Sequence, residues 1–376
     1  MPHNQPISRL ATAMCTIALT FAASYLHADS FTQTNLVSDV PGLANTTDPN
    51  LKNPWGVSFS ATSPFWVSNQ GTGASTLYDG AGNINSLVVT IPAGATPPNG
   101  PTGQVFNSSG AFLVNKAPAN FIFDTLNGTI SAWNPSAGTT AVQMAATPGA
   151  VYTGLAQDTT GGSTFLYAAN STGNIHVFDS SWNDVTSTMF AGKFVDPNPV
   201  AGLVPFNIQT IGSNLYVTYA QLGPMGTPLP GGYVDEYDAN GNFIKRIATG
   251  GPLSAPWGIT LAPSNFGSFS NDLLIGNFGN GEILAYDATT DMFLGTLDGT
   301  NGQPLDNPFL WALETRTGGA NVNTDAVYFT AGINNQEDGL FGEITAATPE
   351  PATIFGTATG LIALVLARLR PKLSNN

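Results

Sequence analysis

The sequence is poor in cysteine, histidine and positive charge. It contains one cysteine, Cys15, three histidines, and ten lysines and arginines against 24 aspartates and glutamates, which gives a net charge of −14. Residues 29–347 contain no cysteine, which excludes disulfides and cysteine nucleophiles from this range. The same range has six basic and 23 acidic residues, a balance of 6 − 23 = −17. This balance excludes nucleic acid as a partner, because neutralising phosphates requires a basic surface.

Nucleophilic and paired-carboxylate chemistry have little support. Two of the three histidines lie in the first 28 residues, so a Ser-His-Asp triad in the remainder would have to use His176. His176 alternates with Ile175 and Val177, which is typical of an ordinary strand residue. Asp235 and Glu236 are adjacent, and adjacent strand residues point to opposite faces of a sheet. We therefore predict no catalytic residues from these groups.

The first 28 residues have the pattern of a secretory signal peptide. Arg9 supplies a positive charge, an apolar stretch runs from Leu10 to Leu26, and the small residue Ala28 precedes Asp29. We expect cleavage after Ala28 and export across the inner membrane.

The last 29 residues, 348–376, combine a rigid break, an apolar run and a basic end. Pro349-Glu350-Pro351 cannot continue a helix or a central strand, so the folded domain should end at residue 347. The 16 residues 352–367 predict a single membrane helix about 24 Å long. Arg368 and Arg370 follow it and should stay on the cytoplasmic side.

This order of motifs resembles the PEP-CTERM sorting signal of Gram-negative bacteria. The resemblance implies that Pro349, Glu350, Pro351, Arg368 and Arg370 are sorting residues read by an exosortase-type processing enzyme. It also implies delivery to the cell surface or an exopolysaccharide matrix, with transient anchoring through the membrane helix. The motif specifies a location and no reaction.

A repeat of about 50 residues fills the middle of the chain. Asn53-Pro54-Trp55-Gly56-Val57 matches Ala255-Pro256-Trp257-Gly258-Ile259, and each is followed by an apolar segment, a glycine-rich turn and an aromatic-Asp pair. The first column of the repeat recurs at spacings of 47 to 54 residues, at Gly56, Gly103, Gly154, Asn207, Gly258 and Ala312. Six such units, rich in β-branched and aromatic residues, predict an all-β, six-bladed β-propeller over residues 29–347.

The repeats resemble NHL-type six-bladed propellers, and the whole chain resembles exported bacterial propellers of uncharacterised function. Residues Phe31 to Val37 precede the first complete unit and have no partner within it. We expect this segment to pair with the last blade, between Val327 and Ile344, and so to close the ring. No long amphipathic helix is expected, since the chain contains 42 glycines and 27 prolines.

Propeller sites usually form where the innermost strands begin, so the first residues of each repeat are candidates. Trp55, Trp257 and Trp311 occupy nearly the same column in three repeats. Exposed indole rings there would stack on sugars, whereas buried ones would pack between blades. The three tryptophans are the candidate ligand-binding residues.

A metal site is the alternative. Metal-dependent lactonases of the gluconolactonase class place a glutamate, two asparagines and an aspartate around one ion. Here Asn53 stands in the position of the glutamate, and Asn207 and Asp306 remain as candidate ligands whose oxygens suit Ca²⁺. We expect no other cofactor.

Three functional hypotheses follow. The first is a non-catalytic exported propeller that binds matrix components, with extracellular polysaccharide as the hypothetical ligand. The second is a metal-dependent, lactonase-like hydrolase acting in the channel. The third is a structural surface protein whose blades contact other proteins.

Overall fold

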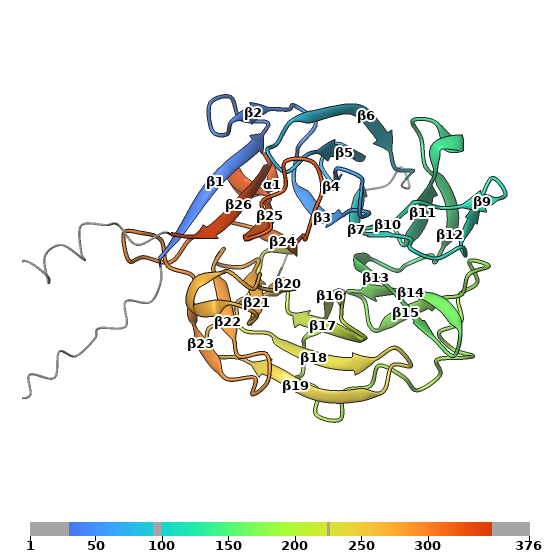
Figure 1. The fold of residues 1–376 in the computed structure, drawn as a ribbon. Helices are drawn as coiled ribbons and strands as arrows, with labels where there is room; N and C mark the ends of the chain where they lie inside the picture. Colours follow the sequence, from blue (N-terminus) through green and yellow to red (C-terminus); the bar gives the residue numbers. More distant parts are fainter. Residues whose placement is uncertain (1–29, 93–98, 224–225, 348–376) are drawn as a thin grey trace, which may run out of the picture.

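The protein is a ring of six β-sheet blades around a central axis (Figure 1), and the prediction of an all-β, six-bladed propeller is confirmed. The computed structural model describes residues 30–92, 99–223 and 226–347. The predicted signal peptide, sorting motif and membrane helix lie outside these residues. Within them, no helix is both long enough and apolar enough to cross a membrane.

The first three blades follow the chain in order. The innermost strand of each is named first. Blade one contains β3 (Pro54–Ser58), β4 (Phe65–Asn69), β5 (Ala74–Tyr78) and β6 (Ile84–Thr90). Blade two contains β7 (Pro101–Phe106), β10 (Phe121–Thr125), β11 (Thr129–Trp133) and β12 (Val142–Ala146), and blade three contains β13 (Tyr152–Thr160), β14 (Ser163–Asn170) and β15 (Ile175–Phe178). A separate short hairpin consists of β8 (Leu113–Val114) and β9 (Ala117–Pro118).

The last three blades follow in the same way. Blade four contains β16 (Val204–Ile211), β17 (Asn214–Ala220), β18 (Tyr233–Asp238) and β19 (Phe243–Thr249). Blade five contains β20 (Pro256–Leu261), β21 (Leu273–Asn277), β22 (Ile283–Tyr286) and β23 (Phe293–Thr296), and blade six contains β24 (Leu310–Thr315), β25 (Ala326–Ala331) and β26 (Leu340–Ala346). Helical structure in the described part of the chain consists of short turns, among them η1 (Pro135–Ala137), η3 (Gly267–Phe269) and α1 (Ile333–Gln336).

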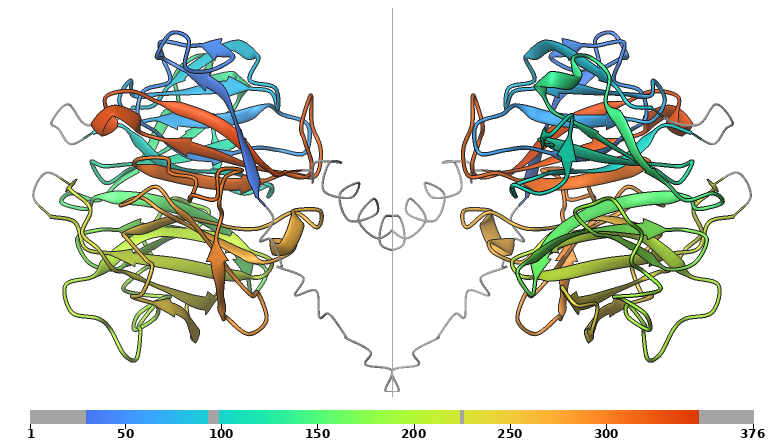
Figure 2. Two further views of the ribbon diagram at one scale, coloured as in Figure 1. Left: turned by 90° about the vertical axis from the view of Figure 1, so that its left-hand side faces the viewer. Right: turned by 90° about the vertical axis from the view of Figure 1, so that its right-hand side faces the viewer.

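The N-terminal strand closes the ring, as the sequence predicted. β1 (Phe31–Ser38) pairs antiparallel with β26, from Phe31 opposite Ala346 to Ser38 opposite Leu340. The blue and red strands lie side by side in Figures 1 and 2. β2 (Thr46–Thr47) adds a parallel pair outside β1. The last blade is therefore built from both ends of the propeller, which couples its closure to the folding of the whole ring.

Glycines in the repeat column let the innermost strands approach one another closely. A Cβ atom on Gly103 would lie 2.3 Å from the backbone nitrogen of Leu155, and one on Gly258 would lie 2.4 Å from the carbonyl oxygen of Trp311. A Cβ on Gly154 would meet Asn207 Oδ1 at 2.1 Å. Side chains at these positions would push the blades apart, so the column sets the narrowness of the channel.

Aspartate-centred turns recur at the outer hairpins. Asp79, Asp179 and Asp238 each accept hydrogen bonds from the backbone amides two and four residues later. The asparagine four residues later donates its side-chain amide to the other carboxylate oxygen. The residue before that asparagine has positive φ, 72° at Gly241 and 68° at Trp182. These carboxylates are occupied by protein donors and stabilise turns.

Candidate functional site at the channel mouth

The three predicted tryptophans meet at one end of the channel. Trp55 stacks on Trp311 with ring centroids 3.5 Å apart, and Trp257 packs edge-on against both, at 6.2 Å and 5.6 Å. Their exposed fractions are 5%, 1% and 4% for Trp55, Trp311 and Trp257. The ring faces are covered by one another and by Phe206 and Phe278. This cluster, the tryptophan plug, fills the channel where the innermost strands begin and presents no open face to a sugar.

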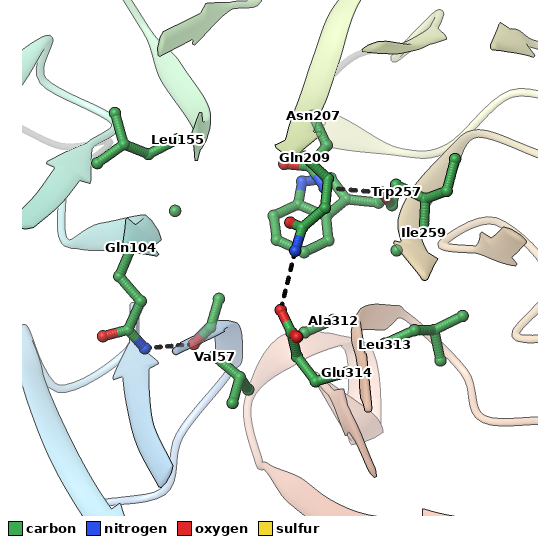
Figure 3. Close-up of a pocket in the computed structure, with 13 residues that line it drawn as sticks. Val57, Gln104, Leu155, Asn207, Gln209, Trp257, Ile259, Ala312, Leu313 and Glu314 are labelled. Atoms are coloured by element: carbon green, nitrogen blue, oxygen red, sulfur yellow. Dashed lines mark hydrogen bonds between the residues drawn. The ribbon is translucent and has the colours of Figure 1, made fainter. Parts of the chain in front are cut away.

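Between the blades, the axis itself holds almost no space. The axial cavity has a volume of about 10 Å³ (Figure 3). It is lined by Gln104, Gln209, Glu314 and five residues of the repeat column: Gly56, Gly103, Asn207, Gly258 and Ala312. A volume of this size holds about one water molecule. The axis is therefore a packed core, and ligands must bind at an end of it.

The other end of the channel is open and polar. A cavity of about 270 Å³, the channel mouth, lies where the innermost strands end. Its lining combines amide and hydroxyl side chains, one carboxyl group and two phenylalanines: Val57, Ser58, Phe59, Gln104, Val105, Phe106, Ser108, Leu155, Ala156, Gln157, Gln209, Thr210 and Glu314. The candidate site thus lies at the carboxyl ends of the innermost strands, opposite to the end we expected.

Glu314 is the only ionisable side chain that lines the mouth within the described residues. It is on β24 and accepts a hydrogen bond from Gln209 Nε2 on β16 at 3.1 Å, across the channel (Figure 3). Burial raises the pKa of Glu314 to about 8, partly offset by the Gln209 hydrogen bond. The nearest basic side chain, Arg316, immediately after β24, donates instead to the carbonyl oxygens of Ser60 and Ser63. The carboxyl group therefore has no cationic partner among the residues that line the mouth.

Hydrogen bonds fix the orientation of two further glutamines. Gln104 Nε2 donates to the carbonyl oxygens of Gly56 and Trp66 at 2.7 and 2.6 Å. Only the nitrogen of the amide can donate, so these two bonds fix which side-chain atom is Nε2 and which is the oxygen, Oε1. Gln157 Nε2 donates to Asn107 Oδ1 at 2.8 Å. Asn107 cannot be flipped, because its Nδ2 donates to two carbonyl oxygens. The half-buried Gln157 consequently keeps its amide oxygen as an acceptor at the mouth.

A buried carboxyl group supports the channel wall. Asp124, on β10, is fully buried, and its Oδ1 lies 2.6 Å from Thr102 Oγ1. The same hydroxyl lies 2.9 Å from the carbonyl oxygen of Tyr152. Thr102 Oγ1 is thus within donating distance of both Asp124 Oδ1 and the carbonyl oxygen of Tyr152. Burial raises the pKa of Asp124 to about 7, partly offset by hydrogen bonds from Thr102 and from the backbone amides of Gly103 and Gly154.

The three candidate metal ligands lie in separate environments. Asn53 Oδ1 accepts from Trp311 Nε1 at 3.0 Å, and Asn207 Nδ2 donates to the carbonyl oxygen of Trp257 at 2.8 Å. Asp306 lies against Gly281, where its Oδ1 would be 2.5 Å from an added Cβ. Of the three, only Asn207 lines the axial cavity. Asn53 and Asn207 thus hold together different parts of the ring through their hydrogen bonds, and Asp306 lies outside the axial cavity.

His176 is held by neighbours in its own blade. Its Nδ1 lies 2.8 Å from Tyr152 Oη, and Asn170 Nδ2 is 3.4 Å from Nε2. Burial lowers the pKa of His176, and the nearby Asp184, at 3.9 Å, opposes this effect. These contacts agree with an ordinary strand residue.

Gln157, Gln209 and Glu314 were not identified from the sequence. They follow their repeat columns by three, two and two residues, so no common position aligns them. A detectable signal is the presence of long polar side chains in strands that otherwise consist of apolar and small residues.

Relatives of the chain are found among giant-virus proteins. The uncharacterised protein R648 of Acanthamoeba polyphaga mimivirus is 30% identical over 325 residues, which cover 82% of this chain and 78% of that protein. The chain belongs to the same family as R648. The uncharacterised protein L690 of the same virus is 29% identical over 326 residues, covering 82% and 84%. No protein-family model matches the sequence.

Solved structures share the fold with the R648 family. The soluble aldose sugar dehydrogenase from Escherichia coli, in the apo-form, superposes with a TM-score of 0.51 at 12% identity, covering 85% of this chain and all of that one (100%). A protein of unknown function from Bacteroides thetaiotaomicron gives a TM-score of 0.52 at 12% identity, covering 84% and 76%. At this identity the similarity establishes the propeller architecture alone.

Proposed function

We propose that this chain is an exported, non-catalytic binding module that holds a hydroxyl-rich ligand, such as a sugar unit of an extracellular polysaccharide, at the channel mouth. The observation that carries the proposal is the composition of the 270 Å³ cavity: fixed amide groups, hydroxyls and two partly exposed phenylalanines. Amides and hydroxyls match the donors and acceptors of a sugar, and phenylalanine rings can cover its apolar face.

The lining favours binding over hydrolysis. General acid–base hydrolysis of a sugar bond uses two carboxyl groups. Among the described lining residues, Glu314 is the single acid and no histidine is present. The lactonase-like alternative would need Asn53, Asn207 and Asp306 to share an ion, and their separate hydrogen bonds and contacts give it no support.

The location in our proposal rests on the sequence motifs. Residues 1–28 would direct export, and Pro349-Glu350-Pro351 with the basic end would be read by an exosortase-type enzyme at the membrane. Replacing these three residues by alanines should change where the protein accumulates and leave its melting temperature unchanged. Fractionation of cells and a thermal melt test this, and a melted propeller would contradict the domain boundary at residue 347.

A matched pair of variants tests the site. Gln157→Ala removes a fixed amide from the mouth, whereas Gln143→Ala removes an exposed glutamine from the outer strand β12. Isothermal titration with soluble oligosaccharides should show binding to the wild type and to Gln143→Ala, and at least about tenfold weaker binding to Gln157→Ala, since tenfold is about 1.4 kcal/mol. Equal binding by both variants, or none by the wild type to any neutral or charged oligosaccharide, would contradict the proposal.

A further inference from the structure

The free groups at the channel mouth are mostly acceptors. Gln157 Nε2 and Gln209 Nε2 each donate one N–H, to Asn107 and Glu314, so both amide oxygens and one N–H of each amide remain for a ligand. Thr210 Oγ1 donates to the carbonyl oxygen of Gln157. Glu314 accepts one hydrogen bond, and its second carboxyl oxygen has no hydrogen-bond partner among the described residues. A ligand that binds here must therefore supply several donors.

Buried unpartnered oxygens extend this acceptor character. Ser58 is 8% exposed and Gln104 is 5% exposed, and both line the mouth. Ser58 Oγ and Gln104 Oε1 find no hydrogen-bond partner within the described part of the chain. Buried polar atoms are normally satisfied, so their presence beside a cavity indicates a site built for a polar ligand.

The charge balance points to a cationic donor. The mouth holds one carboxyl group, Glu314, and no basic side chain among its described lining residues. Arg316, two residues later, is turned toward the backbone of blade one. The surrounding domain, residues 29–347, has a net charge of −17 and attracts cations. Burial keeps Glu314 mostly protonated at pH 6 in the free protein, and an ammonium group in contact with it would lower its pKa and favour the ionised carboxylate.

We infer that the channel mouth is selective for a ligand that presents a protonated amino group to Glu314, such as an amino sugar unit. The inference rests on the proposed function, which it narrows to one class of ligand. The carboxyl oxygen of Glu314 and the amide oxygens of Gln209 and Gln157 would accept the three N–H groups of the ammonium. A divalent cation is a poorer match, because calcium takes about six to eight oxygens and usually several carboxylates.

Three trisaccharides with the same β-1,4 linkage provide the test: the free-amine trisaccharide of glucosamine, its fully N-acetylated form, and cellotriose. They differ only in the group at carbon 2 of each ring. At about pH 6, isothermal titration should show the amine form binding at least about tenfold more tightly than the other two, which corresponds to about 1.4 kcal/mol. Glu314→Gln should abolish this preference and retain the binding of cellotriose.

The control variant is Glu337→Gln, which makes the same side-chain replacement at an exposed position beyond α1. It should keep the full preference for the amine form, which separates a local contact from the general field of the domain. Equal binding of the three sugars by the wild type would overturn the inference and leave the binding module standing. Binding of none of them would instead count against the proposed function. Tight binding of CaCl₂ that is lost in Glu314→Gln and blocks the amine sugar would assign the site to a metal and also overturn the inference.

Discussion

The two ends of the channel are built from the same six strands and differ in what fills them. At the start of the strands, three indole rings from β3, β20 and β24 pack against one another and exclude solvent. At the end of the strands, glutamine and glutamate side chains from β13, β16 and β24 line an open cavity. The comparison teaches that the two ends differ in role. Burial of the aromatic rings at one end stabilises the fold, whereas the accessible polar groups at the other end can bind a ligand.

Removing the closing strand should have the largest effect, because both ends depend on a closed ring. Deletion of residues 29–38 removes the strand that pairs with β26 from Phe31 to Ser38 and exposes the outer edge of the last blade. We expect loss of the cooperative thermal transition, since the strand's contribution is comparable to a domain's net stability of about 5–15 kcal/mol. A synthetic peptide of residues 29–38 added in trans should restore part of the transition, and a scrambled peptide should not. An unchanged melting curve would show that closure does not depend on β1.

Truncation of the tryptophan plug should have the next largest effect. Trp311→Ala removes the ring that stacks on Trp55 and contacts Phe278, and should lower the free energy of unfolding by about 3–5 kcal/mol. The half-buried Trp182, which donates to the carbonyl oxygen of Leu113, is the control. Trp182→Ala should cost less, about 1–2 kcal/mol, in the same denaturant titration. Similar losses for both variants would mean that the plug is not a stability element.

Much of the tryptophan plug and the closing strand could be predicted from the sequence. Trp55 and Trp257 stand in matching repeat motifs, and the unpaired segment Phe31 to Val37 implied the closing strand. These features are repeated or conspicuous, so local pattern is sufficient to find them. Whether the indoles cover one another depends on how blades distant in sequence pack, which no local pattern specifies.

The polar residues of the channel mouth could not be predicted, for a physical reason. All six innermost strands change register along their length. In the three that carry the polar residues, the shifts lie between Tyr152 and Gly154, between Pro205 and Asn207, and between Leu310 and Leu313. Each such irregularity reverses which side chains face the channel, so strict alternation fails to place the residues that follow. Gln157, Gln209 and Glu314 all lie beyond these shifts.

Replacing Asp124, in the channel wall between the two ends, should have a moderate and pH-dependent effect on the free energy of unfolding. The folded-state pKa of Asp124 is about 7, above its ordinary value of 3.8, so the folded state binds more protons between these values. Wild-type stability contributed by this group is present below about pH 4 and is lost as the pH rises toward 7, with a slope approaching about 1.4 kcal/mol per pH unit. Asp124→Asn removes the titratable group, keeps an oxygen that can accept from Thr102, and should flatten this slope in denaturant titrations from pH 4 to 8. An identical slope in both proteins would show that Asp124 is not protonated in the fold.

At the mouth, Glu314→Gln should have the smallest effect on stability. The pH dependence of the Glu314 contribution should have the same sign as that of Asp124. Burial raises the pKa of Glu314 from 4.5 to about 8, so the stability it contributes is present below about pH 4.5 and is lost as the pH rises through 8. Glu314 is half-buried beside an open cavity, and solvent screening should keep the difference between variant and wild type below about 1 kcal/mol. Urea titrations at pH 5 and pH 8.5 measure it, with Glu337→Gln as the control for the loss of one charge. If Glu314→Gln instead destabilised the fold at every pH, Glu314 would belong with the tryptophans as a structural residue, and the division between a stabilising end and a recognition end would fail.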